Sequence, residues 1–213
     1  MAKIIDGKAI SKAIKDEVKQ QVEEWKQQGI TVTLAVIQVG SNQASTVYVN
    51  NKKKACEYTG IRSLSYELPE ETTQEELLSL VRELNDREDV NGILVQLPLP
   101  AHMDEDEVIR TISPKKDVDG FHPQSVGALC IGQPGFVSCT PAGIIELLKR
   151  SGVEIAGREC VVIGRSNIVG KPMAILLLRE NGTVTVAHSK TADLKAVARR
   201  ADILVVAVGK AKM

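Results

Sequence analysis

The sequence lacks an excess of charge of either sign, because Lys and Arg together number 27 and so do Asp and Glu. A protein that grips nucleic acid needs basic residues gathered on one surface, so this balance argues against that class. There is also no apolar run near the roughly 20 residues of a membrane-spanning helix. The segment Met1–Gly7 has no apolar signal core and contains an acid, so we expect no export signal and a cytoplasmic protein.

Cysteine and histidine are scarce as well. The cysteines are Cys56, Cys130, Cys139 and Cys160, and the histidines are His102, His122 and His188. The cysteines include no C-x-x-C pair and no spacing typical of a metal site, so free thiols in a reducing compartment are the simplest interpretation. Isolated histidines are usually surface or structurally satisfied residues, so we predict no metal site.

What the chain does contain is the composition of a soluble globular protein, with 43% hydrophobic and 25% charged residues. A length of 213 residues suits one or two domains. In the first part, apolar spacing predicts helices at 9–28, 45–59, 77–84 and 104–111 and strands at 33–39, 61–68 and 93–95. The segment 127–140 is glycine-rich and weakly patterned, as in a connection, and a helix is predicted at 142–150.

The pattern changes from Glu159 onward. Strands are predicted at 160–163, 183–187 and 203–208, and they alternate with helices at 171–179 and 192–200. This alternation is half of a doubly wound dinucleotide-binding fold. We therefore predict an α/β protein with two α/β domains: residues 1–140 for catalysis and substrate, and residues 141–213 as an incomplete Rossmann-like domain with a parallel sheet.

Two helix starts are predicted from capping residues. Ser45 can cap the helix that Gly60 ends, because its hydroxyl can accept from unpaired backbone amides. The run 72–75, Thr-Thr-Gln-Glu, is interpreted as a capping box for the next helix. Within the first of these helices Tyr48 and Lys52 are four residues apart, so the phenol and the amine share a face. An aromatic ring beside an amine could hold a flat substrate, although a solvated charged face explains the same spacing.

Gln96 stands where a buried strand stops. Pro98 and Pro100 cannot donate to a sheet, so the strand ends before them and Gln96 lies at its carboxyl end, where open α/β sheets place ligands. A glutamine that merely caps the strand is the alternative. In the loop 113–121, Asp117 and Asp119 could likewise be turn formers that bond to nearby backbone.

The loop from Gly164 to Gly170 is a candidate phosphate site. Its five intervening residues match neither G-x-G-x-x-G nor a P-loop, but a glycine at a strand end before a helix N-terminus suits an anion. The next strand ends at 187–191, Ala-His-Ser-Lys-Thr, without the acid that usually holds an NAD ribose. With Arg165 nearby, this favours NADP over NAD. An ordinary βαβ unit whose Arg165 is only solvated stays open.

Five motifs occur together in one order. They are Tyr48-x3-Lys52, V-Q-L-P-L-P at 95–100, K-D-V-D-G at 116–120, G-R-S-x-I-V-G-x-P at 164–172 and H-S-K-T at 188–191. In this the chain resembles the bifunctional methylenetetrahydrofolate dehydrogenase/methenyltetrahydrofolate cyclohydrolase family, often called FolD, over essentially its whole length. The resemblance implies NADP-dependent oxidation of 5,10-methylenetetrahydrofolate to the 5,10-methenyl form, hydrolysis of that cation to 10-formyltetrahydrofolate, and a homodimer.

The resemblance also implies roles for particular residues. Lys52 would be the principal catalytic residue, Gln96 would position it, Tyr48 would stack near the pterin and p-aminobenzoate, and Asp119 would hydrogen-bond the pterin. Val95 and Leu97 would complete the folate site. The pyrophosphate and 2′-phosphate of NADP would be held by Gly164, Arg165, Ser166 and Ser189.

Family members continue for several elements beyond the point that residue 213 reaches, so we expect a chain that lacks the C-terminal segment. Three parallel strands with two crossover helices would leave apolar surface and a strand edge uncovered, which predicts marginal stability or association. Two alternatives stay open. One is a different NADP oxidoreductase similar to shikimate dehydrogenase, and the other is a catalytically impaired fragment that only folds or binds NADP.

Overall fold

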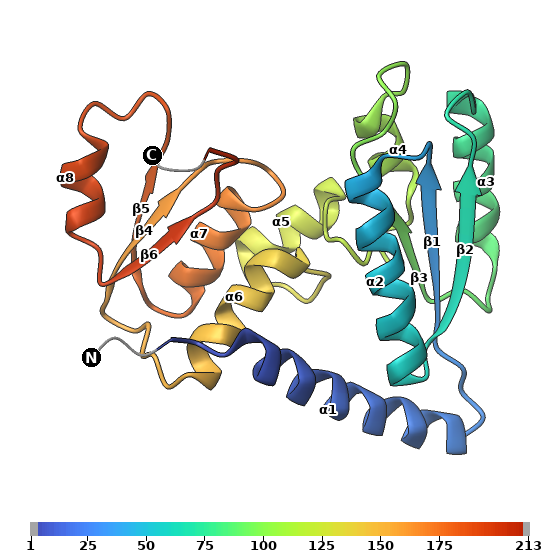
Figure 1. Ribbon diagram of the computed structural model, residues 1–213, viewed down its shortest axis with the longest axis horizontal. Helices are drawn as coiled ribbons and strands as arrows, with labels where there is room; N and C mark the ends of the chain where they lie inside the picture. The colour runs from blue at the N-terminus through green and yellow to red at the C-terminus, as the bar shows by residue number, and fades with distance from the viewer. Residues whose placement is uncertain (1–3, 211–213) are drawn as a thin grey trace. The chain divides into compact units, whose positions relative to one another are not determined.

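The computed structural model describes residues 4–210, which form two compact units. One unit is Asp6–Val118, and the other contains Ile4, Ile5 and residues 119–210. The boundary predicted after residue 140 lies inside the second unit, near the start of helix α6 (Cys139–Arg150). Each unit contains a parallel sheet of three strands, and Figure 1 shows both.

The first unit has the strand order β2-β1-β3, with β1 (Thr33–Val39) between β2 (Arg62–Leu68) and β3 (Gly92–Val95). All pairings are parallel, and Ile37 of β1 stands opposite Val95 of β3. The carboxyl ends of β1 and β3 therefore lie side by side. The crossovers are α2 (Gln43–Thr59) and α3 (Gln74–Asp86), and the unit also contains α1 (Gly7–Gln27) and α4 (Glu105–Thr111).

Alternation along β1 assigns its two faces. Ala35, Ile37 and Val39 are buried in the core formed with α3 and α4, where Leu77 and Val108 are fully buried. Val36 between them packs on the opposite side with Val49 of α2. Because successive side chains of a strand point to opposite faces, a continuous apolar run such as that of β1 requires a helix on each side.

The second unit repeats this plan with the order β5-β4-β6, where β4 is Glu159–Ile163, β5 is Thr183–Ala187 and β6 is Ile203–Val206. Cys160 and Val162 face α6 and α7 (Gly170–Arg179), where Met173 is fully buried. Val161 and Ile163 face α8 (Leu194–Arg199). The predicted α/β class and the two three-stranded parallel sheets are confirmed.

Three local predictions were wrong. Helix α5 (Pro123–Ile131) occupies part of the segment 127–140 that was predicted as a connection, with Pro at its first turn and Gly132 as a left-handed C-cap. Helix α2 starts at Gln43, because the Asn42 side chain accepts from the amide of Ser45; Ser45 is buried inside the helix. The capping box of α3 is one residue later than predicted and joins Thr73 to Glu76.

Candidate active site

Lys52 and Gln96 meet although 43 residues separate them in the chain. The Lys52 Nζ donates to Gln96 Oε1 at 2.9 Å. Gln96 directly follows β3, and its backbone N–H donates to Ile37 O at 2.8 Å, which continues the sheet by one bond. Its side-chain Nε2 donates to Leu97 O at 2.6 Å. The amide group is therefore oriented by its own backbone, with the oxygen turned to the lysine.

Helix α2 is fixed to the sheet by a second glutamine. Gln38, which is buried in β1, donates through Nε2 to Thr46 Oγ1 at 3.0 Å and to Gly40 O at 3.1 Å. Gln38 is thus hydrogen-bonded both to the loop before the helix and to the first helical turn. Gly60 ends the helix with φ +81°, in the left-handed region that favours glycine. Side-chain bonds at the start of α2 and the left-handed cap at its end thus define the helix that carries Lys52.

The other predicted folate-site residues have different environments. Tyr48, one turn before Lys52, is 63% exposed, which leaves its ring free to act as a platform. Val95 is buried in the core beside α3, and Leu97 packs partly against the same core. A hollow of about 350 Å³ lies at this end of the sheet, lined by residues 39–42, Glu70 and residues 98–100.

Asp119 lies at the start of the second unit, in the K-D-V-D-G loop. Lys116 anchors this loop, because its Nζ donates to the carbonyls of Leu84, Asn85 and Arg87 at 2.7 to 3.0 Å, at the C-terminal end of α3. Gly120 follows with φ +68° and is tightly packed. Lys116 and Gly120 thus have specific contacts on either side of Asp117 and Asp119.

The glycine loop at the end of β4 is closed by its own hydrogen bonds. Gly164 has φ +120°, and a Cβ there would lie 2.4 Å from Ala207 O. A Cβ at Gly170 would lie 2.2 Å from Gly164 O, so the helix start and the strand end are in backbone contact. Ser166 Oγ accepts from the amides of Val169 and Gly170 at 3.2 and 3.3 Å. Both acceptor sites of this hydroxyl are used, and only its proton is left to donate.

The turn after β5 is also organised by side chains. The His188 N–H donates to Thr191 Oγ1 at 2.9 Å, and the Lys190 N–H donates to His188 Nδ1 at 3.2 Å. Ser189 and Lys190 are exposed, as is Arg165 in the glycine loop. The cations of Arg165 and Lys190 and the hydroxyls of Ser166 and Ser189 suit an anionic nucleotide, and residues 187–191 include no carboxylate.

Comparison with known proteins identifies both units. Residues 5–119 match the model of the tetrahydrofolate dehydrogenase/cyclohydrolase catalytic domain, and residues 138–213 match the NAD(P)-binding domain of the same family. The chain belongs to this family. Lys52 and Gln96 fall within the first match, and the loop from Gly164 to Gly170 falls within the second.

Relatives agree along nearly the whole chain. The bifunctional protein FolD of Lachnoclostridium phytofermentans is 74% identical over 210 residues, which are 99% of this chain and 74% of that protein. The crystal structure of FolD methylenetetrahydrofolate dehydrogenase/cyclohydrolase from Campylobacter jejuni superposes with a TM-score of 0.95 at 50% identity, covering 97% of this chain and 74% of that one. The crystal structure of the dehydrogenase-cyclohydrolase of Trypanosoma brucei, complexed with NADP cofactor and inhibitor, has a TM-score of 0.93 and is 42% identical. The match covers 98% of this chain and 72% of that one.

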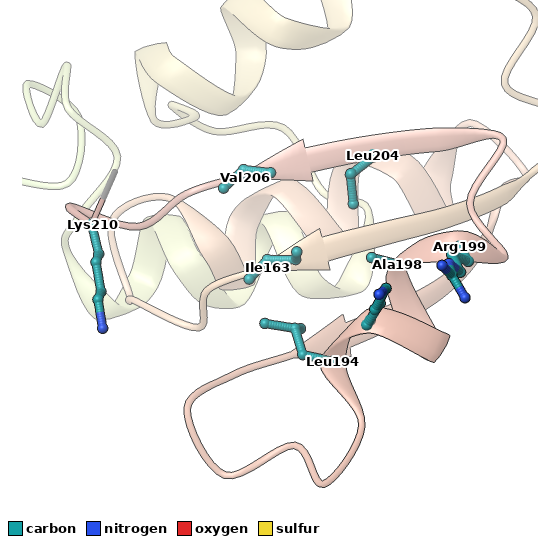
Figure 2. Close-up of a pocket in the computed structure, with 8 residues that line it drawn as sticks. Ile163, Leu194, Ala198, Arg199, Leu204, Val206 and Lys210 are labelled. Atoms are coloured by element: carbon teal, nitrogen blue, oxygen red, sulfur yellow. The ribbon is translucent and has the colours of Figure 1, made fainter. Parts of the chain in front are cut away.

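A groove of about 750 Å³ lies on the α8 side of the second sheet, and Figure 2 shows the residues along it. Its floor is apolar, with Leu204 and Val206 of β6 about half exposed, and Lys195, Arg199 and Lys210 contribute cations. Among residues 4–210, α8 packs against β4 on this face, and Leu204 and Val206 of β6 are left partly exposed there.

Residues 4–210 were also compared with the requirements of a metal site and of a membrane-spanning helix. No group of three or more His, Cys, Asp and Glu side chains in that range is placed to hold a metal ion. None of the helices described there is both long and apolar enough to cross a membrane.

Proposed function

We propose that this chain performs the two reactions for which its family is named. It oxidises 5,10-methylenetetrahydrofolate to the 5,10-methenyl form with NADP, and it hydrolyses that product to 10-formyltetrahydrofolate. The observation that carries the proposal is the 2.9 Å bond from Lys52 Nζ to Gln96 Oε1, in a chain that matches both domains of the family. Neither a shikimate-dehydrogenase-like enzyme nor a binding-only fragment is favoured by these matches.

The first step requires orientation above all. The hydride leaves a carbon between two nitrogens, so the product is a delocalised cation that needs little covalent help from the protein. When bound, NADP supplies the nicotinamide ring that takes up the hydride. We assign the flat folate rings to the exposed face of Tyr48, with Asp119 as hydrogen-bond partner of the pterin and Val95 and Leu97 at its edge.

The second step requires control of a proton. Water adds to the cationic carbon and must lose a proton, and the ring opens as a nitrogen gains one. We assign this transfer to Lys52, because a lysine amine can hold or release a proton where its surroundings favour it and an arginine cannot. Gln96 holds the amine through a neutral oxygen, so the amine is oriented without a second charge.

The cofactor is assigned to the second unit. Arg165 follows β4 and Ser189 follows the neighbouring strand β5, and both side chains are exposed. They suit the 2′-phosphate, which favours NADP over NAD. Gly164 gives the pyrophosphate close access to the backbone. Ser166 has one free proton to donate, since its acceptor sites are occupied by Val169 and Gly170.

Further assignments follow from the family resemblance. We propose that the enzyme acts in the cytoplasm as a homodimer, with residues 1–140 as the catalytic region and residues 141–213 as the cofactor region. Sedimentation equilibrium of the purified protein tests the dimer directly, because a monomer mass at micromolar concentration would contradict it.

The replacement Lys52→Met tests the proposal. We expect it to abolish hydrolysis of methenyltetrahydrofolate while the dissociation constant for NADP, measured by calorimetry, stays unchanged. Lys53→Met is the matched control, because Lys53 Nζ pairs with Glu67 at 2.6 Å on the helix surface. NADPH formation from methylenetetrahydrofolate, with NAD and shikimate as alternative reactants, tests the oxidation. Loss of NADP binding together with hydrolysis would make Lys52 structural.

A further inference from the structure

Ser138 uses its side chain in an unusual way. It is the N-cap residue of α6, a position where serine normally accepts a hydrogen bond from the second or third amide of its helix. Within α6 no such bond is formed by this side chain. The hydroxyl instead donates to Ile168 O at 2.7 Å, and Ser138 is only 5% exposed. The Ser138 side chain therefore bonds to a residue 30 positions later in the chain, where a typical N-cap serine would bond to its own helix.

The acceptor lies in the middle of the glycine loop. Ile168 lies between Ser166 and Gly170, the first residue of α7. The Ser166 hydroxyl accepts hydrogen bonds from two backbone amides of the loop. Those bonds define the shape of the loop, but they are all internal to residues 166–171. The bond from Ser138 joins this loop to a segment outside it.

The other side of that segment touches the folate motif. A Cβ at Gly120 would lie 2.9 Å from Phe136 O, from the carbonyl carbon of Val137 and from Ser138 N. Gly120 therefore lets the backbone of 136–138 lie directly on the residue after Asp119. All these residues belong to one compact unit, so the contact is internal to it.

We propose that Ser138 is a positioning residue that joins the cofactor loop to the folate-binding Asp119–Gly120 segment. This inference rests on the proposed function. Hydride transfer needs the two reacting carbons to be within about 3 to 3.5 Å in line. The segment 136–138 contacts Gly120 on one side and holds Ile168 on the other, so it sets where the loop presents a dinucleotide relative to Asp119. Hydrolysis needs no cofactor and does not depend on this distance.

The replacement Ser138→Ala separates the two reactions. We expect NADP to bind about fivefold more weakly, the factor for loss of one neutral hydrogen bond, and kcat/KM for NADP reduction to fall by at least as much. Hydrolysis of methenyltetrahydrofolate should stay unchanged. Hydrogen exchange of residues 165–170, measured without cofactor, should become faster. Ser138→Thr keeps the donor and should restore binding and exchange.

The matched control is Thr72→Val. Thr72 is similarly buried, and its hydroxyl also donates to a backbone carbonyl, Pro69 O, at 2.7 Å. This variant should change neither exchange in 165–170 nor NADP affinity. Unchanged exchange and affinity in Ser138→Ala would overturn the inference, and so would equal losses in both reactions. Absence of both reactions in the unmodified chain would instead contradict the proposed function, and the exchange result would still decide the link.

Discussion

The bond between Lys52 and Gln96 gives the most direct test of how the site works. Gln96→Leu keeps most of the side-chain volume and removes the oxygen that accepts from Lys52 Nζ at 2.9 Å, together with the Nε2 group that donates to Leu97 O at 2.6 Å. The backbone N–H bond to Ile37 O does not involve the side chain, so the end of β3 should be unaffected. What is lost is the orientation of the amine.

The size of the effect follows from the type of bond. A hydrogen bond to a charged group contributes about 1.5 to 3 kcal/mol, which corresponds to about a 10- to 150-fold change in rate if the bond persists in the transition state. Both side chains are partly exposed, so water can replace part of the interaction and we expect the lower half of that range. The loss should appear in kcat for methenyltetrahydrofolate hydrolysis, because orientation of the amine acts on the chemical step.

A double-mutant cycle provides the decisive assay. The free energy of unfolding in urea is measured for the unmodified chain, Gln96→Leu, Lys52→Met and the double variant, which isolates the coupling of the pair. Gln20→Leu is the control, since Gln20 makes an exposed bond to Glu24 on α1. A coupling of zero, or a hydrolysis rate in Gln96→Leu equal to that of Gln20→Leu, would refute the role of Gln96.

Two further predictions concern the cofactor loop and acid stability. Gly164→Ala should lower the free energy of unfolding by at least about 2 kcal/mol and abolish NADP binding, because its Cβ would lie 2.4 Å from Ala207 O. Gly157→Ala is the control, since Gly157 also has a positive φ but has open space around it, and it should show the cost of backbone strain alone. Equal losses of stability in the two variants would contradict the clash. The pKa of Glu76 is held below its ordinary value of 4.5 by hydrogen bonds from the backbone and then the hydroxyl of Thr73. The stability that this capping box contributes is therefore present above that value and is lost as the pH falls through the lowered pKa. Glu76→Gln should make the urea midpoint fall less steeply between about pH 6 and 3. An unchanged slope would contradict this prediction.

The sequence alone determined most of the elements. The apolar run of β1 and the helical spacing around Leu77 are local patterns, and each strand and helix they predict is present. The family was also recoverable, because its motifs are short runs of residues in a fixed order. The position of Gln96 at a strand end could also be predicted from the sequence, because Pro98 and Pro100 cannot continue the strand.

The errors in the sequence analysis arose where two local signals compete. Asn42 and Ser45 are both good capping residues, and the choice of Asn42 depends on where the loop leaves β1, which Gln38 fixes through a bond across the chain. The helix after Pro123 was missed because its glycine weakens the pattern while its packing supplies the stability. Gln38 itself had a signal, as a polar residue inside an otherwise apolar strand.

Only the tertiary structure decided which distant side chains meet. The pairing of β1 with β3 brings Gln96 to Lys52, and the packing of Gly120 on 136–138 brings Ser138 to Ile168. Such contacts depend on the register of strands and on the path of loops, which long-range burial fixes and local periodicity does not record. The residue types of this protein therefore indicate its chemistry, and its fold decides the geometry in which they act.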